Sequence, residues 1–214
     1  MNLDGTPDDE DIAFYATYGT WQPLTVAALA ELMQGFPHPW WLVGGHAIDA
    51  FTGGPRPHTD IDVSFFAHSI ADFRKQLEGR YHLWSNHGGT FRVLDDNHPE
   101  PLDPLAQVWA RENAQSPWVL DGVPGPSADG RWQSKRDNEH VADLEEVSWV
   151  DERGVRSLNP EIVLLFKAAQ NREMDRFDLD RTWPLLTDEK RQWLRAAVRR
   201  FDSTHPWNER LTQR

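Results

Sequence analysis

The chain has 214 residues, and its 22 basic and 34 acidic residues give it a net charge of −12. This balance argues against a nucleic-acid partner, because binding to phosphates needs an excess of Lys and Arg. It favours a small cationic substrate, although such a charge is also common where it only keeps a protein soluble. The absence of cysteine excludes disulfides, a thiolate zinc site and a cysteine nucleophile.

Targeting signals are not evident in the sequence. The N-terminus is acidic, with no basic segment followed by an apolar run, and no stretch of about 18 apolar residues occurs. We therefore expect a cytoplasmic protein without a membrane partner.

The first third of the chain predicts alternating helices and strands. Residues 1–12 are acidic, contain little to bury, and are expected to be disordered. Thr25 and Gly35 are typical of the start and end of a helix, and two apolar runs read as strands, the first followed by a short helix that Gly53 and Gly54 end. The expected elements are a helix at 24–35, a strand at 40–45, a helix at 46–54, a strand at 60–67 and a helix at 69–79.

The rest of the chain predicts short strands and then helices. Asn159 and Pro160 begin a helix that is apolar on both sides, which predicts that layers cover it; Lys167 is expected to emerge at a cleft where this burial ends. The expected elements are strands at 81–84, 90–94, 106–110 and 117–121, a hairpin or extended loop at 121–132, two short strands around a turn at 152–154, and a last helix at 188–201.

We interpret this order as an α+β fold: a small mixed sheet flanked by helices, followed by a C-terminal helical module. The expected organisation is a disordered segment at 1–12, an α/β domain at 13–155, and a helical module at 156–214 that closes a cleft.

Two short motifs carry the candidate chemistry. Asp60 and Asp62 are two residues apart on a predicted strand, so their side chains point to the same face and can bind Mg²⁺. Gly44 and Gly45 end a buried strand and open a helix, so their amides can approach an anion. Each motif also occurs without function, as a solvated pair or an ordinary turn. Together they would place a polyphosphate beside its metal ions.

The stretch "GGHAIDAFTGGPRPHTDIDVSF" resembles the signature of the nucleotidyltransferase superfamily and is most similar to its aminoglycoside 2''-adenylyltransferase-like branch. The matching positions are Gly44, Gly45, Ala47, Asp49, Arg56, His58, Asp60, Asp62 and Val63. Similarity continues in "GRWQSKRD", "GVRSLNPEIVLLFKAA", "RFDLD" and "HPWNERL". Met174 departs from the pattern, where members of the branch often have Lys.

The resemblance implies Mg²⁺-dependent transfer of a nucleoside monophosphate, AMP from ATP, to a hydroxyl of a small acceptor such as an aminoglycoside. A third carboxylate would complete the metal site or act as base, and Asp121 in "SPWVLDGVP" is the first candidate. Asp121 followed by Gly122 is also a strong turn signal, and Asp95 or Asp96 is the fallback. Asp60, Asp62 and Asp121 are therefore the expected catalytic and metal-binding residues.

The nucleotide would be bound by Gly44, Gly45, Arg56, His58 and Lys167. Lys167 also fits a lysine at the edge of a buried helix, and His58 fits a residue filling a polar niche. His46 has no assigned role, and Asp49 is expected to be structural.

Two other functions are compatible with parts of the sequence. "DIDVS" contains the Asp-x-Asp pattern of haloacid-dehalogenase-type phosphatases, but there the first Asp ends a buried strand, whereas Asp60 follows the loop "GGPRPHT". The second alternative is a nucleotidyltransferase-like regulatory module or toxin–antitoxin component with little catalysis, against which the intact Gly-Gly and Asp-x-Asp motifs argue.

Overall fold

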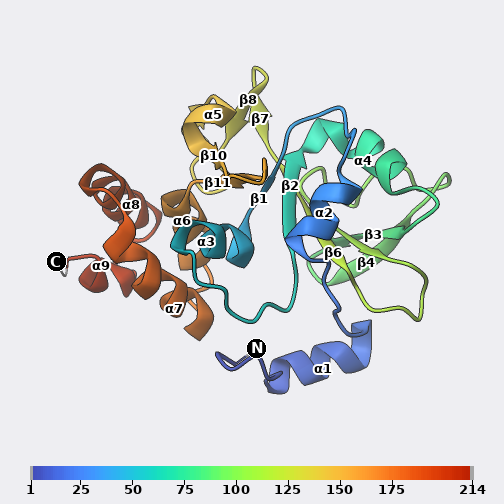
Figure 1. The fold of residues 1–214 in the computed structure, drawn as a ribbon, viewed down its shortest axis with the longest axis horizontal. Helices are drawn as coiled ribbons and strands as arrows, with labels where there is room; N and C mark the ends of the chain where they lie inside the picture. The colour runs from blue at the N-terminus through green and yellow to red at the C-terminus, as the bar shows by residue number, and fades with distance from the viewer. Residues whose placement is uncertain (1, 213–214) are drawn as a thin grey trace.

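The computed structural model describes residues 2–212, so Met1 of the predicted disordered segment and residues 213–214 of the predicted helical module lie outside the described residues. Figure 1 shows the elements in chain order. The helices are α1 (Asp9–Tyr18), α2 (Val26–Leu32), α3 (Gly44–Thr52), η1 (Ala67–Ser69), α4 (Ile70–Leu77), α5 (Leu144–Val147), α6 (Pro160–Ala168), α7 (Glu173–Thr182), η2 (Trp183–Leu185), α8 (Asp188–Phe201) and α9 (Trp207–Arg210). The strands are β1 (Trp40–Leu42), β2 (Asp62–Phe66), β3 (His82–His87), β4 (Thr90–Leu94), β5 (Gln107–Arg111), β6 (Leu120–Gly125), β7 (Ser127–Ala128), β8 (Arg131–Gln133), β9 (Val141–Ala142), β10 (Ser148–Val150) and β11 (Arg156–Leu158).

An eight-stranded mixed sheet with the order β10-β11-β1-β2-β6-β5-β3-β4 is the centre of the fold. Strand β1 pairs in parallel with β11, and β2 pairs in parallel with β6, while the other neighbours are antiparallel. A second, three-stranded sheet is formed by β7, β8 and β9. The predicted α+β class with a mixed sheet and C-terminal helices is confirmed.

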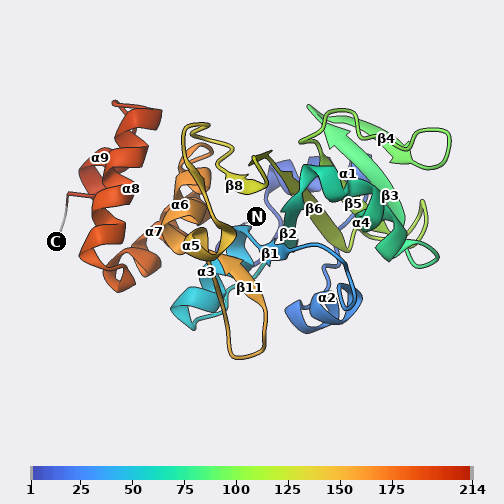
Figure 2. The ribbon, with the colours of Figure 1, turned by 90° about the horizontal axis from the view of Figure 1, so that it is seen from above.

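The C-terminal helices lie at one end of the molecule and the β3–β4 hairpin at the other, as two perpendicular views show (Figures 1 and 2). Helix α6 connects the C-terminal helices to the rest of the molecule, since it packs against α7 and α8 and also against α3. Strand β11, which begins at Arg156, belongs to the main sheet, so the sheet continues past the predicted boundary at residue 155. The division into two modules stays a prediction.

Helix α6 is buried on all sides, as its sequence predicts. Ile162, Val163, Leu164 and Leu165 are each at most 2% exposed, because α3, α7 and α8 pack around the helix. Burial of such consecutive side chains stabilises the fold by about 1.5–3 kcal/mol for each. None of the described helices has the length and apolar character needed to cross a membrane.

The N-terminal segment differs from its prediction, because α1 begins at Asp9 and residues 9–12 of the expected disordered segment are helical. Asp8 caps this helix: its carboxylate accepts from the amide of Asp11, and the Asp11 carboxylate accepts from the amide of Asp8. Aromatic contacts then hold the helix on the sheet, with ring centroids 5.6 Å apart for Phe14 and Trp109. These contacts are made with residues that are far away in the sequence. The N-terminal segment itself therefore shows no apolar periodicity from which a helix could be predicted.

Helix α7 is not among the predicted elements, and its composition explains why. Two of its buried residues, Asp175 and Asp178, are carboxylates that are fully buried against basic partners. A helix whose buried face is charged has no apolar stripe, which is the signal by which amphipathic helices are recognised.

Candidate functional site

The Gly-Gly turn packs directly against the carboxylate strand. Gly44 has a φ of 62°, and a Cβ atom added to it would collide with the carboxylate of Asp62. The backbone N–H of Val43 donates to the carbonyl of Asp62 at 3.2 Å. Gly45 is equally restricted, since its added Cβ would meet the ring of His58. Glycine is therefore required at both positions, because any side chain would displace the residues beside the turn.

The register of two parallel strands brings the third carboxylate to the first two. Asp62 of β2 lies opposite Asp121 of β6, and Asp60 precedes Asp62 by two residues. Carboxylate oxygens of Asp60, Asp62 and Asp121 lie within 4.8 Å of one another. Asp121 and Gly122 do not form a turn, because both lie inside β6.

Asp121 has one oxygen that its surroundings satisfy and one that they do not. Gln107 donates from Nε2 to Asp121 Oδ2 at 2.5 Å, whereas the buried Oδ1 meets no donor of the described chain at full hydrogen-bond geometry, although the Trp109 side chain lies near enough to lower the pKa of Asp121. Asp121 is only 2% exposed. A buried acceptor without a donor is costly, and a cation is a partner that would satisfy it.

Burial and neighbouring negative charge disfavour the ionised forms of Asp62 and Asp121. Burial, followed by the charge of Asp60, raises the pKa of Asp62 to about 7. Burial, followed by the charges of Asp62 and Asp60, raises the pKa of Asp121 well above its usual range. Because a divalent cation would relieve both burial and repulsion, and hard cations bind carboxylate oxygens, the donor set fits Mg²⁺.

The other candidates for the third carboxylate lie elsewhere. Asp95 accepts from the amides of Asn97 and His98 in the loop after β4, and Asp96 pairs with Arg74. Neither residue belongs to the group formed by Asp60, Asp62 and Asp121.

Lys167 does not emerge at a cleft, which corrects the prediction. The residue is 8% exposed, and its Nζ lies 3.0 Å from Asp175 and 2.9 Å from Asp178. Helix α7, which the sequence did not predict, supplies both carboxylates. The basic group is buried because its charge is neutralised.

Arg56 is tied to the same helix. Its Nε and Nη2 donate to the two oxygens of Asp178 at 2.9 and 2.8 Å, so the pair is bidentate. Burial alone would raise the pKa of Asp178, but the hydrogen bond from Arg56 and the charge of Lys167 lower it. Asp178 therefore connects the loop before β2 to both α6 and α7.

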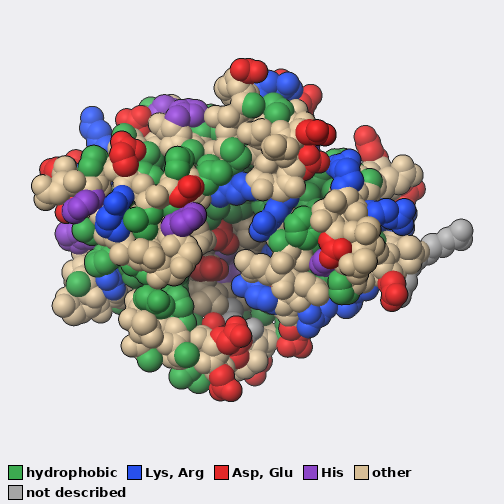
Figure 3. Space-filling view, turned by 180° about the vertical axis from the view of Figure 1, so that it is seen from behind, with side chains coloured by type: hydrophobic (Ala, Val, Ile, Leu, Met, Phe, Trp, Pro, Cys, Tyr) green, Lys and Arg blue, Asp and Glu red, His purple; other side chains and the backbone are tan. Residues whose placement is uncertain are grey.

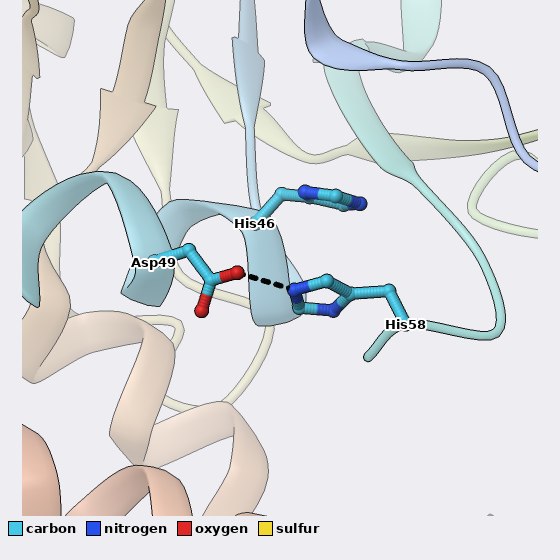
Figure 4. A group of neighbouring side chains, drawn as sticks. All are labelled: His46, Asp49 and His58. Atoms are coloured by element: carbon cyan, nitrogen blue, oxygen red, sulfur yellow. Dashed lines mark hydrogen bonds and ion pairs between the residues drawn. The ribbon is translucent and has the colours of Figure 1, made fainter. Parts of the chain in front are cut away.

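His46, Asp49 and His58 form a second polar group behind the turn (Figure 4). His58 Nε2 and Asp49 Oδ2 are 2.6 Å apart, and the rings of His46 and His58 stack with centroids 3.9 Å apart. Arg56 Nη1 lies 3.1 Å from His58 Nδ1, so Nδ1 accepts and Nε2 donates to Asp49. Burial, followed by the charge of His58, lowers the pKa of His46 to about 4. Asp49 also pairs with Arg181 of α7.

Lys135 is a basic residue at the site that was not among the candidates. Burial lowers its pKa to about 8, while the nearby charge of Asp121 and then that of Asp62 favour its ammonium form. No hydrogen bond or ion pair joins it to another residue of the described chain. It borders a cavity of about 700 Å³ between the segment after β8 and helix α8. The sequence signal for it was "GRWQSKRD", which carries the resemblance.

Acidic side chains occupy the depth of a hollow in the molecular surface, with Lys or Arg side chains near its rim (Figure 3). The glycine turn, the three converging carboxylates and Lys135 are candidate ligands for a metal-bound polyphosphate. This fold and this set of side chains are compatible with the nucleotidyltransferase class of proteins.

Comparison with known proteins agrees with this class. Residues 25–86 match the family model described as aminoglycoside-2''-adenylyltransferase. No curated protein matches the chain.

Similar solved structures share the fold over most of the chain. The solution structure of the antibiotic-resistance factor ANT(2'')-Ia is 20% identical, with a TM-score of 0.54 over 82% of this chain and 89% of that chain. The crystal structure of ANT(2'')-Ia with adenylyl-2''-tobramycin is 20% identical, with a TM-score of 0.53 over 82% and 95%. The lincomycin-bound lincosamide antibiotic adenylyltransferase LnuA is 20% identical, with a TM-score of 0.52 over 75% and 97%. The chain thus has the fold that these adenylyltransferases have.

Proposed function

We propose that the protein is a Mg²⁺-dependent nucleotidyltransferase that moves AMP from ATP to a hydroxyl group of a small molecule. The observation that carries this proposal is the convergence of Asp60, Asp62 and Asp121 beside the Gly44–Gly45 turn. The match of residues 25–86 to an adenylyltransferase family supports the reaction class.

Asp60, Asp62 and Asp121 would hold the metal. Bound there, Mg²⁺ supplies positive charge that makes the α-phosphate more electrophilic and stabilises the leaving pyrophosphate. Asp121, whose Oδ1 has no donor within the described chain, also takes the proton of the attacking hydroxyl.

The backbone around Gly44 and Gly45 binds the phosphates, since α3 begins there without a side-chain cap. Lys135 contributes the nearest unpaired ammonium group. Arg56 and Lys167 act in a different way from the one predicted: paired with Asp178, they hold the loop and the helices in place and add positive potential near Asp62. His58 fixes this loop through Asp49.

The overall charge of −12 makes an aminoglycoside the first acceptor to test. A cytoplasmic location, where ATP is available, is part of the proposal. The alternative of a regulatory module is not favoured, because such a module has no need of three ionisable groups held in mutual repulsion.

The test is pyrophosphate release from MgATP with a panel of aminoglycosides and lincosamides, together with calorimetry of MgATP binding. We expect release with at least one acceptor and its loss in Asp62→Asn. If neither turnover nor MgATP binding is detected with the wild-type protein, the proposal is wrong. Binding without turnover favours the regulatory module.

A further inference from the structure

Trp109 closes the sheet face beyond the carboxylates. It lies opposite Asp121 in the register of β5 and β6, and it is 8% exposed. The ring of Phe14 covers it from α1, with the ring centroids 5.6 Å apart, and the ring of Trp21 covers it at 4.9 Å. A pocket beyond Trp109, beside Trp84 of β3, shares no lining residue with the carboxylate site. This pocket is therefore a separate cavity.

The separate pocket has a volume of about 330 Å³ and aromatic walls. Tyr18 and Phe91 stack with ring centroids 4.8 Å apart, and Trp84 and Trp118 meet edge to face at 6.2 Å. The lining contains no acidic residue of the described chain. Its volume is at the lower end of the range for small-molecule sites, which commonly have aromatic walls, so the pocket fits a compact ring.

Arg111 is the charged group of this pocket, and stacking satisfies only part of it. Its guanidinium carbon lies 4.1 Å from the ring centroid of Trp118 and 4.6 Å from that of Trp84. The two indoles thus contact the faces of the guanidinium, as in other cation–π pairs. The five N–H donors of a guanidinium point outward in its plane, and they need acceptors that an indole face does not provide.

These donors have no acceptor among residues 2–212. Arg111 is 9% exposed, and its buried Nε has no hydrogen-bond partner; the same holds for Nε1 of Trp84, which lines the same pocket. No hydrogen bond or ion pair of the described chain engages Nη1 or Nη2. Burial lowers the pKa of Arg111, with no nearby carboxylate to oppose this effect, but a guanidinium stays charged at neutral pH. The buried Lys167, by contrast, is neutralised by two carboxylates.

We infer that this pocket is a second small-molecule site, separate from the carboxylate site, and that it binds a compact aromatic carboxylate. A guanidinium binds a carboxylate through two parallel N–H donors, and the aromatic walls provide faces for a planar ring. A carboxylate supplies both the counter-ion and the acceptors that Arg111 lacks, whereas Arg111 would repel a cationic ligand. The inference does not depend on the proposed function, because the two sites share no residue.

The test uses two matched probes, 4-nitrobenzoate and 4-nitrobenzamide, which share a ring and differ in charge. We expect calorimetry at pH 7 to show about tenfold tighter binding of the benzoate, as a charge-assisted hydrogen bond provides. Arg111→Gln should abolish this preference, and Arg111→Lys should reduce it. Arg199→Gln, at an exposed position, is the matched control and should leave the preference unchanged.

Two further measurements locate the bound probe. Ala114 lines the pocket and is exposed, so it can be replaced while Arg111 is kept. Ala114→Trp should abolish binding of the benzoate, because the indole would occupy the pocket. Saturating MgATP should not compete with the benzoate, because the pocket and the carboxylate site are separate.

Equal binding of the two probes, no binding of either, or a preference that persists in both Arg111 variants would overturn the inference. Competition between the benzoate and MgATP would also overturn it, because the benzoate would then occupy the carboxylate site. If the preference is present but MgATP does not bind, the inference stands and only the proposed function fails. Arg111→Lys and Ala114→Trp keep the test decisive should Arg111→Gln not fold.

Discussion

Asp62 and Asp121 lie opposite one another across the parallel pair β2 and β6, although they are far apart in the sequence. Parallel strands are not joined by a short turn. The order of the strands in the whole sheet therefore places these two carboxylates side by side. Burial raises the pKa of both groups, and the charge of Asp60 adds to this effect at Asp62 while the charges of Asp62 and Asp60 add to it at Asp121, so a cation is a natural partner.

Replacing Asp62 or Asp121 should lower the activity and raise the stability of the metal-free protein. We expect Asp62→Asn and Asp121→Asn to lower nucleotidyl transfer by about 100-fold or more, because each removes a carboxylate that we propose to bind Mg²⁺. In EDTA, both variants should unfold at higher urea than the wild type, with about 1–2 kcal/mol greater free energy of unfolding, since repulsion is removed. Added MgCl₂ should stabilise the wild type more than the variants. Asp96→Asn, at a fully exposed side chain, is the control and should change neither quantity.

Gly44→Ala should be far more harmful than the same change at Gly54. The new methyl group would collide with the Asp62 carboxylate, and alanine is strained at a φ of 62°. We expect about 1–3 kcal/mol loss in the free energy of unfolding and at least about tenfold lower activity. Gly54 has open space around its added Cβ and no positive φ, so Gly54→Ala serves as the matched control. Equal urea midpoints for the two variants would contradict the packing described for the turn.

Asp178→Asn should destabilise the protein strongly. Asp178 is fully buried and partners both Arg56 and Lys167, so its loss leaves buried positive charge uncompensated. Breaking a buried pair in this way costs about 3–5 kcal/mol. The measurement is urea unfolding at pH 7, and Asp188→Asn, whose side chain is exposed, should cost less than about 1 kcal/mol.

The ion pairs that Asp178 forms with Arg56 and Lys167 also predict how the free energy of unfolding depends on pH. The pKa of Asp178 is lowered in the folded protein, so its stabilisation is present above the unfolded value near 3.8 and is lost as pH falls through the folded value. The difference between wild type and Asp178→Asn should therefore stay constant from pH 7 to 5 and shrink below pH 4. A difference that already disappears at pH 6 would contradict this assignment.

Lys135→Met should weaken nucleotide binding while stabilising the nucleotide-free protein. Without its ammonium group we expect the KM for ATP to rise about tenfold. The pKa of Lys135 is lowered to about 8, so burial disfavours the charged form. The free-energy cost of burying the charged lysine is complete below pH 8. It declines as pH rises from 8 towards 10.5, the pKa of Lys135 in the unfolded chain, because the folded protein releases the proton first.

Urea unfolding at pH 7 and pH 10 tests whether this cost decreases as pH rises. The stabilisation by Lys135→Met should be larger at pH 7 than at pH 10. Lys75→Met, at an exposed position, should show the same small effect at both pH values and leave the KM for ATP unchanged. A larger stabilisation at pH 10 would show that Lys135 is held by an ion pair instead.

Much of the secondary structure could be predicted because its signals are local. Thr25 caps α2, Pro160 begins α6 as its first residue, and the strands containing Trp41 and Val63 are short apolar runs bounded by loops. Helices α1 and α7 were missed, since aromatic contacts with distant strands hold the first and buried ion pairs hold the second.

The sequence by itself predicted the Gly44–Gly45 turn, the proximity of Asp60 and Asp62, and the candidacy of Asp121, because chain geometry relates residues only a few positions apart; the predicted strand began at Asp60, whereas β2 begins at Asp62. Tertiary structure alone decided that Asp121 and not Asp95 or Asp96 joins the group, and that Lys167 is neutralised by Asp175 and Asp178. Charge and burial at those positions depend on partners from other elements, which strand register and helix packing select and local sequence does not encode.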